Sequence, residues 1–158
     1  MKNLINFLFP IKTAYAHCDI PCGIYDPHAA QVAAHTVLRM TGLINELSGD
    51  TRETEHKLAR YTKVKEKHAE IVKHEVVVLW GDYFKEEHLK EYPQLSETVY
   101  RTLKLASKSK QEINIEVAKD LLTQVQVIAE IFYKSKDLTP IKVKPPFPTE
   151  GEIVSFKA

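Results

Sequence analysis

The sequence predicts an all-α protein, an antiparallel up-down four-helix bundle with a short hook in front of its first helix. Four stretches between residues 27 and 135 place apolar residues at helical spacings of three and four. The links between these stretches are short, which favours antiparallel packing of neighbouring helices. With 158 residues, of which 44% are hydrophobic, the chain can bury one core and is too short for two independent ones. We therefore expect one domain with tails.

The first two helices are expected at 27–47 and 51–80. Asp26 and Pro27 suit a helix start, because aspartate caps free N–H groups and proline fits the first turn. A Ser-Gly pair after the first helix supplies its stop, and the second helix ends near Gly81. The apolar side of the first helix consists of Val32, Val37, Met40, Ile44 and Leu47.

The remaining chain contains two more helices and a tail. Residues 81–93 lack sustained periodicity and include a glycine and a proline, so we expect a structured connection there. Helices follow at 93–108 and 111–135, and segment 138–158, with four of the eight prolines, is expected to be an extended tail. The fourth helix has the widest apolar stripe: Val117, Leu121, Leu122, Val125, Ile128 and Phe132.

Charge and hydropathy exclude two classes of partner. The chain has 22 Lys and Arg against 21 Asp and Glu, a formal charge of +1, which gives no global attraction to nucleic acid or to anionic membranes. No apolar run approaches the length needed to span a bilayer. We therefore expect neither nucleic acid nor a membrane as a partner.

Residues 1–16 look like a segment that is removed on maturation. Lys2 precedes a short apolar stretch, and the Ala-Tyr-Ala sequence that ends at Ala16 has the small-x-small form of a cleavage site. Cleavage after Ala16 makes His17 the first residue, with a free amine.

Both cysteines of the chain, Cys18 and Cys22, lie directly behind His17. Residues four apart share one face of a helix, but Pro21 and Gly23 argue against a helix here. A turn must therefore bring the two sulfur atoms together. The result is a short hook with two thiols, an imidazole and, after cleavage, a terminal amine.

Three kinds of chemistry fit this hook. A closed zinc site needs a distant fourth ligand such as His28 or His35, and the paired CxxC spacing typical of zinc sites is absent from the sequence. A disulfide between Cys18 and Cys22 is a simple outcome in an exported protein. A chain that begins His-Cys can also place the amine, the amide of Cys18 and both thiolates in a plane around nickel(II) or copper(II), with the imidazole as a fifth, axial ligand.

The stretch HCDIPCGIYDP at 17–27 resembles the nickel-binding hook of the nickel superoxide dismutase family. A second block supports the resemblance. It contains Lys73-His74, the stretch from Val78 to Trp80, Asp82-Tyr83-Phe84-Lys85, and later Tyr92-Pro93-Gln94-Leu95. Together the matching residues cover about 17–137, so the resemblance divides the chain into a removed segment at 1–16, a nickel-hook bundle at 17–137 and a Pro-rich tail at 138–158.

The resemblance implies a homohexamer of four-helix bundles with one nickel ion per subunit. It implies an enzyme that converts superoxide to dioxygen and hydrogen peroxide while nickel cycles between the 2+ and 3+ states. The implied ligands are the amine and imidazole of His17, the amide and thiolate of Cys18 and the thiolate of Cys22. Asp19 and Pro21 are implied to shape the loop.

Tyr25 and Tyr83 are implied to line the approach of the substrate. Tyr25, ordered water or a ligand thiol are the candidates for supplying protons. Because superoxide is an anion, lysines near the second block are candidates for steering it, and the alternative is that they are ordinary surface residues. These lysines are Lys65, Lys67, Lys73 and Lys85.

The chain departs from the family at two positions behind the axial imidazole. A carboxylate in the first helix and an arginine in the second hold this ring in the family, and the corresponding residues here are Ala33 and His68. Such partners orient a ligand and tune its donor strength. His68, alone or with His35, is a candidate substitute, and the alternative for each is a histidine that bonds locally.

The altered partners keep alternatives open. One is a non-catalytic nickel- or copper-binding bundle, a metal carrier or sensor. Another is a secreted bundle with a Cys18–Cys22 disulfide and no metal. The resemblance implies a cytoplasmic proenzyme that a maturation protease cuts after Ala16, whereas the Ala-Tyr-Ala sequence also suits export after signal-peptide cleavage.

Overall fold

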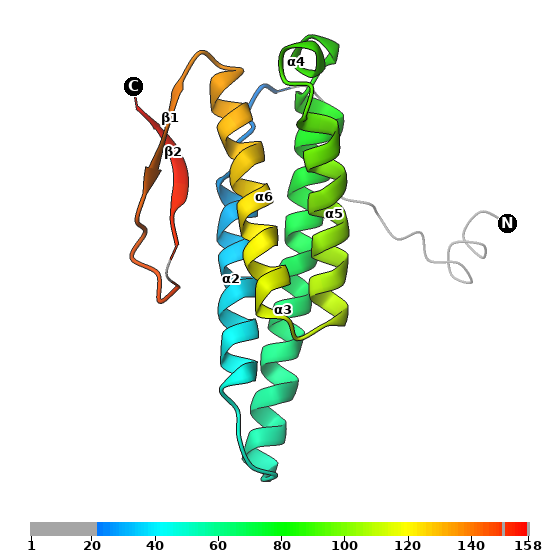
Figure 1. The fold of residues 1–158 in the computed structure, drawn as a ribbon, viewed down its shortest axis with the longest axis vertical. Coiled ribbons are helices and arrows are strands. Elements are labelled where there is room, and N and C mark those ends of the chain that lie inside the picture. Colours follow the sequence, from blue (N-terminus) through cyan, green and yellow to red (C-terminus); the bar gives the residue numbers. More distant parts are fainter. Residues whose placement is uncertain (1–21, 150, 158) are drawn as a thin grey trace, which may run out of the picture.

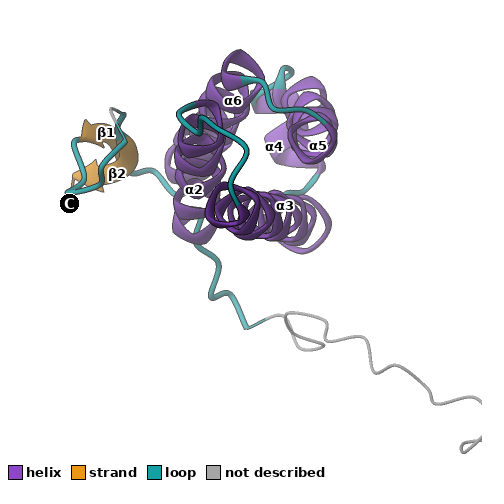
Figure 2. Ribbon diagram, turned by 90° about the horizontal axis from the view of Figure 1, so that it is seen from below, coloured by secondary structure: helices purple, strands orange, loops and turns teal. Residues whose placement is uncertain are grey.

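The computed structural model describes residues 22–149 and 151–157, and its main body is a bundle of four long helices (Figure 1). These are α2 (His28–Asn45), α3 (Arg52–Val78), α5 (Leu95–Gln111) and α6 (Ile115–Lys134). The helices alternate in direction, and α2 and α5 each pack against both α3 and α6 (Figure 2). The predicted up-down four-helix bundle is confirmed.

Side-chain caps start the helices where the sequence predicts them. The Asp26 carboxylate accepts a hydrogen bond of 2.6 Å from the backbone N–H of His28, directly after Pro27. The Thr51 hydroxyl accepts from the backbone N–H of Thr54 at the start of α3. Each cap satisfies an N–H group that has no partner inside its helix.

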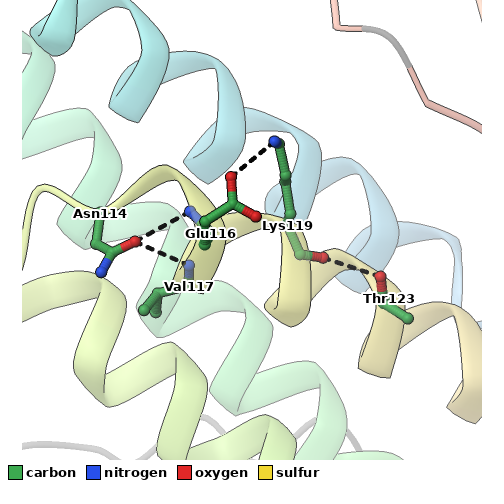
Figure 3. Close-up of polar contacts among 5 residues, drawn as sticks. All are labelled: Asn114, Glu116, Val117, Lys119 and Thr123. Atoms are coloured by element: carbon green, nitrogen blue, oxygen red, sulfur yellow. Dashed lines mark hydrogen bonds and ion pairs between the residues drawn. The ribbon is translucent and has the colours of Figure 1, made fainter.

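The first turns of α6 show a third cap (Figure 3). The side-chain oxygen of Asn114 accepts hydrogen bonds from the backbone N–H groups of Glu116 and Val117, at 3.0 and 3.3 Å. Lys119 forms an ion pair with Glu116, and the Thr123 hydroxyl donates to the carbonyl of Lys119. This end of α6 is therefore fixed by local polar contacts.

The predicted structured connection between the second and third long helices is confirmed, and its first residues continue the helix. A π-helical turn, η1 (Leu79–Tyr83), extends α3, and the N–H of Phe84 closes it by donating to the Leu79 carbonyl at 2.9 Å. A short helix, α4 (Glu86–Glu91), follows. The wider turn carries the helical path two residues beyond the predicted end near Gly81, and it places Tyr83 at the end of the bundle.

The apolar stripe predicted for the fourth helix forms part of the core, whereas in α2 only Val37 and Ile44 of the predicted stripe are buried. In α6 all six residues of the predicted stripe are buried, because this helix packs against both α2 and α5. Buried residues from the other long helices complete the core: Ala30, Ala34, Val37, Ala69, Val72, Val76, Leu95, Val99 and Ala106.

The C-terminal segment differs from the expected extended tail. Strands β1 (Thr139–Val143) and β2 (Ile153–Lys157) pair as an antiparallel two-stranded sheet, which packs on the outside of the bundle against α2 and α6 (Figures 1 and 2). Ile153 and Val154 are buried there. Burial of these two β-branched side chains explains why a Pro-rich segment folds back.

Among the described residues, no helix combines the length and apolarity that crossing a membrane requires.

Candidate functional site

A cavity of about 380 Å³ opens at the end of the bundle where the hook meets α2. It lies between three parts of the chain: the residues that precede α2, the connection formed by η1 and α4, and the C-terminal end of α6. The lining residues are Gly23, Tyr25, Asp82, Tyr83, Lys85, Glu87, His88, Ser135 and Lys136.

The described part of the hook turns sharply beside this cavity. Gly23 has a φ of 74°, a left-handed conformation that glycine adopts without steric cost. The turn directly follows Cys22, whose thiol is exposed. Asp26 and the first turn of α2 anchor the other end of the segment. The hook thus enters the fold next to the cavity, with one of its two thiols in the described structure.

Tyr83 is at the centre of an aromatic cluster in the cavity wall. Its ring lies 5.6 Å from that of Tyr25, at an interplanar angle of 52°, and 4.6 Å from that of Phe132. The His88 ring stacks on Tyr83 at 5.5 Å and 13°. The structure therefore brings together the two tyrosines that the sequence singled out, although 58 positions separate them along the chain.

Polar contacts fix the outer end of Tyr83. Its hydroxyl lies 2.7 Å from the Ser135 hydroxyl, which in turn donates to the Phe132 carbonyl at 2.8 Å. Burial raises the pKa of Tyr83. The phenol is therefore neutral at physiological pH. The ammonium group of Lys136 lies 5.0 Å from the centre of the Tyr83 ring, a cation–π arrangement.

Sequence reasoning missed four residues of this site: Glu87, His88, Ser135 and Lys136. A serine followed by a lysine at a helix end is an ordinary capping pattern and gives no sign of a site. Ser135 lies 52 positions from Tyr83 in the chain, and only the bundle topology brings α6 back to η1. For His88 a signal existed, because it lies five residues after Tyr83, between two stretches of the second block of the resemblance.

Most of the predicted metal ligands lie outside the described residues. The ligands His17 and Cys18 lie there, as do the loop-shaping residues Asp19 and Pro21, and Cys22 alone of the ligand set is described. Within 22–149 and 151–157 no group of three His, Cys, Asp or Glu side chains could hold a metal ion. An exposed thiol beside a turn and a cavity fits a metal held by the hook itself, since thiolate is a strong nickel ligand.

The two residues that differ from the family pattern take ordinary structural positions. Ala33 is 2% exposed and belongs to the α2 core. His68 hydrogen bonds through Nδ1 to the carbonyl of Val64 in its own helix, at 2.8 Å. It precedes Tyr83 by 15 residues, or about 20 Å along a helix axis. A role of His68 behind the axial imidazole stays a prediction.

The suggestion that His35 assists His68 is wrong. Its Nε2 donates to the Glu152 carbonyl at 3.1 Å, and Nδ1 accepts from the Thr149 hydroxyl at 2.8 Å. Both ring nitrogens are therefore engaged by the C-terminal segment. The sequence could not reveal this, because the expected tail had no assigned position.

The four lysines considered for steering fall into different environments. Lys65 is 1% exposed, and its ammonium group donates to the carbonyls of Ser109 and Glu112, so its assignment as a surface or steering residue is wrong. Lys73 donates to the Ser107 hydroxyl of α5. Lys67 is exposed on α3, and of the four only Lys85 lines the cavity.

Comparisons with known proteins agree on one family. The sequence profile of nickel-containing superoxide dismutase matches residues 12–136. The superoxide dismutase (Ni) of Streptomyces coelicolor is 38% identical over 127 residues, which are 80% of this chain and 93% of the relative. That of Streptomyces seoulensis is 36% identical over 121 residues, 77% of this chain and 88% of the relative. A native crystal structure of nickel superoxide dismutase matches with a TM-score of 0.69 and 37% identity, covering 77% of this chain and 99% of the other.

Proposed function

The chain belongs to the nickel-containing superoxide dismutase family, and from this membership we propose that its hook binds one nickel ion beside the Tyr83 cavity and that superoxide enters there. The chain is a nickel-dependent superoxide dismutase, which converts two superoxide ions and two protons to dioxygen and hydrogen peroxide. The observation that carries the assignment of the site is the position of the Cys22 turn at the cavity that Tyr25 and Tyr83 line.

The hook supplies the donor atoms that this metal needs. The proposed ligands are the amine and imidazole of His17, the amide and thiolate of Cys18 and the thiolate of Cys22. When bound, nickel supplies one-electron chemistry between its 2+ and 3+ states, so that one superoxide is oxidised and a second is reduced. Thiolate and deprotonated amide donors favour the higher oxidation state, which suits this cycle.

The cavity residues admit a small anion. Lys85 and Lys136 bring two positive charges to the lining, and Asp82 and Glu87 bring two negative ones. The Lys136 ammonium group lies 5.0 Å from the centre of the Tyr83 ring and places a positive charge beside that tyrosine. A local positive charge of this kind raises the encounter rate of an anion without changing the net charge of the protein.

Maturation and assembly complete the proposal. Removal of 1–16 by a protease that cuts after Ala16 creates the amine of His17, and we place this step in the cytoplasm. A homohexamer is proposed as the functional form. Exposed apolar side chains close to the hook support an assembly, since Ile24 is 77% exposed and Val77, in the last turn of α3, is 51% exposed.

The test is the decay of superoxide, followed directly after pulse radiolysis. Nickel-loaded protein that begins at His17 is expected to accelerate the decay catalytically, and the uncut chain is the matched control. Cys22→Ser should lose both nickel and activity, because a hydroxyl replaces a thiolate ligand. If the trimmed protein binds nickel and leaves the decay unchanged, the dismutase assignment fails for this chain and a nickel carrier or sensor replaces it.

A further inference from the structure

A chain of two hydrogen bonds leads from Tyr83 into the end of α6. The hydroxyl oxygens of Tyr83 and Ser135 are 2.7 Å apart, and the Ser135 hydroxyl is 2.8 Å from the carbonyl oxygen of Phe132. A serine hydroxyl has a single proton to donate. The direction of the whole chain therefore depends on which of its two neighbours receives that proton.

The Phe132 carbonyl determines the direction. In a continuing helix it would accept from the N–H of Lys136, but α6 ends at Lys134 and this N–H donates to the Tyr133 carbonyl at 3.1 Å. Phe132 is buried, and a buried carbonyl without a partner costs about 1–3 kcal/mol. The Ser135 proton therefore goes to Phe132. Tyr83 must then donate its own proton to Ser135.

We propose that Ser135 is a positioning residue, which turns the phenolic proton of Tyr83 away from the cavity so that Tyr83 presents an oxygen lone pair to an entering molecule. This inference rests on the proposed function, because it concerns the approach of the substrate. Within the part of the chain that the structure describes, polar groups near Tyr83 include the stacked His88, the Lys136 ammonium group over the ring and the neighbouring Tyr25. The structure gives none of them a hydrogen bond to the Tyr83 oxygen in place of Ser135.

The direction of this proton decides what Tyr83 does in the reaction. Superoxide has no proton to donate, so it gains no hydrogen bond from an oxygen that offers only a lone pair. A water molecule can donate one O–H to Tyr83 and the other to superoxide. The reduced superoxide takes its two protons from solvent through such water, while Tyr83 keeps its own proton, hydrogen bonded to Ser135. Tyr83 then orders the proton donor and is not itself the donor.

The experiment uses nickel-loaded protein that begins at His17, with S135A, S135T and Y83F. T123A is the matched control, because it removes an exposed hydroxyl of α6 that also donates to a helix carbonyl, about 18 Å along the helix axis from Ser135. The first readout is the ultraviolet resonance Raman doublet of tyrosine, taken as a difference from Y83F. Its intensity ratio reports whether a phenol donates or accepts hydrogen bonds. The second readout is the inhibition constant of azide, a small anion used as the probe.

The proposal expects a donating Tyr83 in the wild type and in S135T, and loss of the donor signature in S135A. Without Ser135 the Tyr83 O–H group can point into the cavity and donate a hydrogen bond to azide. The inhibition constant of azide should therefore fall about tenfold in S135A, as one hydrogen bond to a charged group implies. T123A should match the wild type in both readouts. A wild-type Tyr83 that only accepts, or an S135A spectrum equal to that of the wild type, overturns the inference.

Failure of the proposed function gives a different result. If the wild type does not catalyse superoxide decay, the dismutase assignment fails, whereas the Raman ratio still reports the direction of the Tyr83 proton. If catalysis is normal and S135A leaves the azide constant unchanged or raises it, the site assignment stands and the role of Ser135 is refuted.

Discussion

Replacement of Gln31 by methionine tests how the C-terminal sheet is attached to the bundle. Gln31, in α2, is fully buried and bonds both backbone groups of Val154: Nε2 donates to the carbonyl at 3.0 Å, and Oε1 accepts from the N–H at 2.8 Å. One amide side chain thus takes the place that a third strand would occupy beside β2. Methionine keeps the length of the side chain and removes both hydrogen bonds.

The expected loss of stability in Q31M follows from the N–H and carbonyl groups of Val154, which lose their hydrogen-bond partner. A buried backbone group without a hydrogen bond costs about 1–3 kcal/mol, so two cost about 2–6 kcal/mol if the sheet stays in place. Undocking avoids this cost but exposes Ile153 and Val154, at about 1.5–3 kcal/mol for each side chain. Both routes lead to a loss of about 3 kcal/mol in the free energy of docking.

The assay combines urea unfolding with hydrogen exchange at the Val154 amide. The matched control is Gln126→Met, because Gln126 also donates to a backbone carbonyl of this segment, that of Glu152, but at an exposed position. Q31M should exchange Val154 about a hundredfold faster, the equivalent of about 3 kcal/mol, and Q126M should stay within a few-fold of the wild type. Equal effects of the two variants would refute the reasoning, because burial would then add nothing to the hydrogen bonds.

Three further predictions concern stability. Burial lowers the pKa of His35 from 6.5, only partly opposed by its bond to Glu152. As the pH falls, the His35 imidazole is protonated in the unfolded chain before it is protonated in the folded protein. The free energy of unfolding should therefore be level above about pH 6.5 and fall below it. H35Q should lose this slope in urea titrations while the exposed H74Q keeps it, and identical slopes would contradict the assignment. A Cβ at Gly151 would lie 2.9 Å from the His35 ring. G151A should therefore lose about 1–2 kcal/mol of stability, which lowers the melting temperature. G42A, with open space around the new methyl group, should leave it level or raise it, and the reverse order would refute the packing argument. K65M removes the donor to two carbonyls at the end of α5 and should cost about 2 kcal/mol in chemical denaturation, whereas unchanged stability would show that the carbonyls find other partners.

The attached sheet lies beyond the part of the chain that the family profile matches. The profile ends at residue 136, and β1 begins at Thr139. Gln31, which bonds β2, and His35, which bonds the segment before β2, nevertheless belong to α2, the helix that follows the hook. Stability of the sheet and of the base of the hook are therefore linked through one helix.

The four-helix bundle was predictable because its signals are local. Spacings of three and four and an Asp-Pro start before His28 each depend on neighbours along the chain. The hook was recognisable for the same reason, since the residues that identify it are consecutive in the sequence, at 17–27. The ends of elements were less predictable, as the extension of α3 by η1 to Tyr83 shows.

The sequence by itself determined the helices, the hook and the family. Only the tertiary structure decided that Ser135 meets Tyr83, that Lys65 is buried, and that His35 and Gln31 bind a C-terminal segment more than a hundred residues away. Contacts of this kind depend on which faces of distant segments meet, and a serine, lysine or glutamine has the same local signature whether it faces solvent or a buried backbone group. The pattern of apolar residues fixes the bundle, and the bundle then decides which polar residues acquire partners.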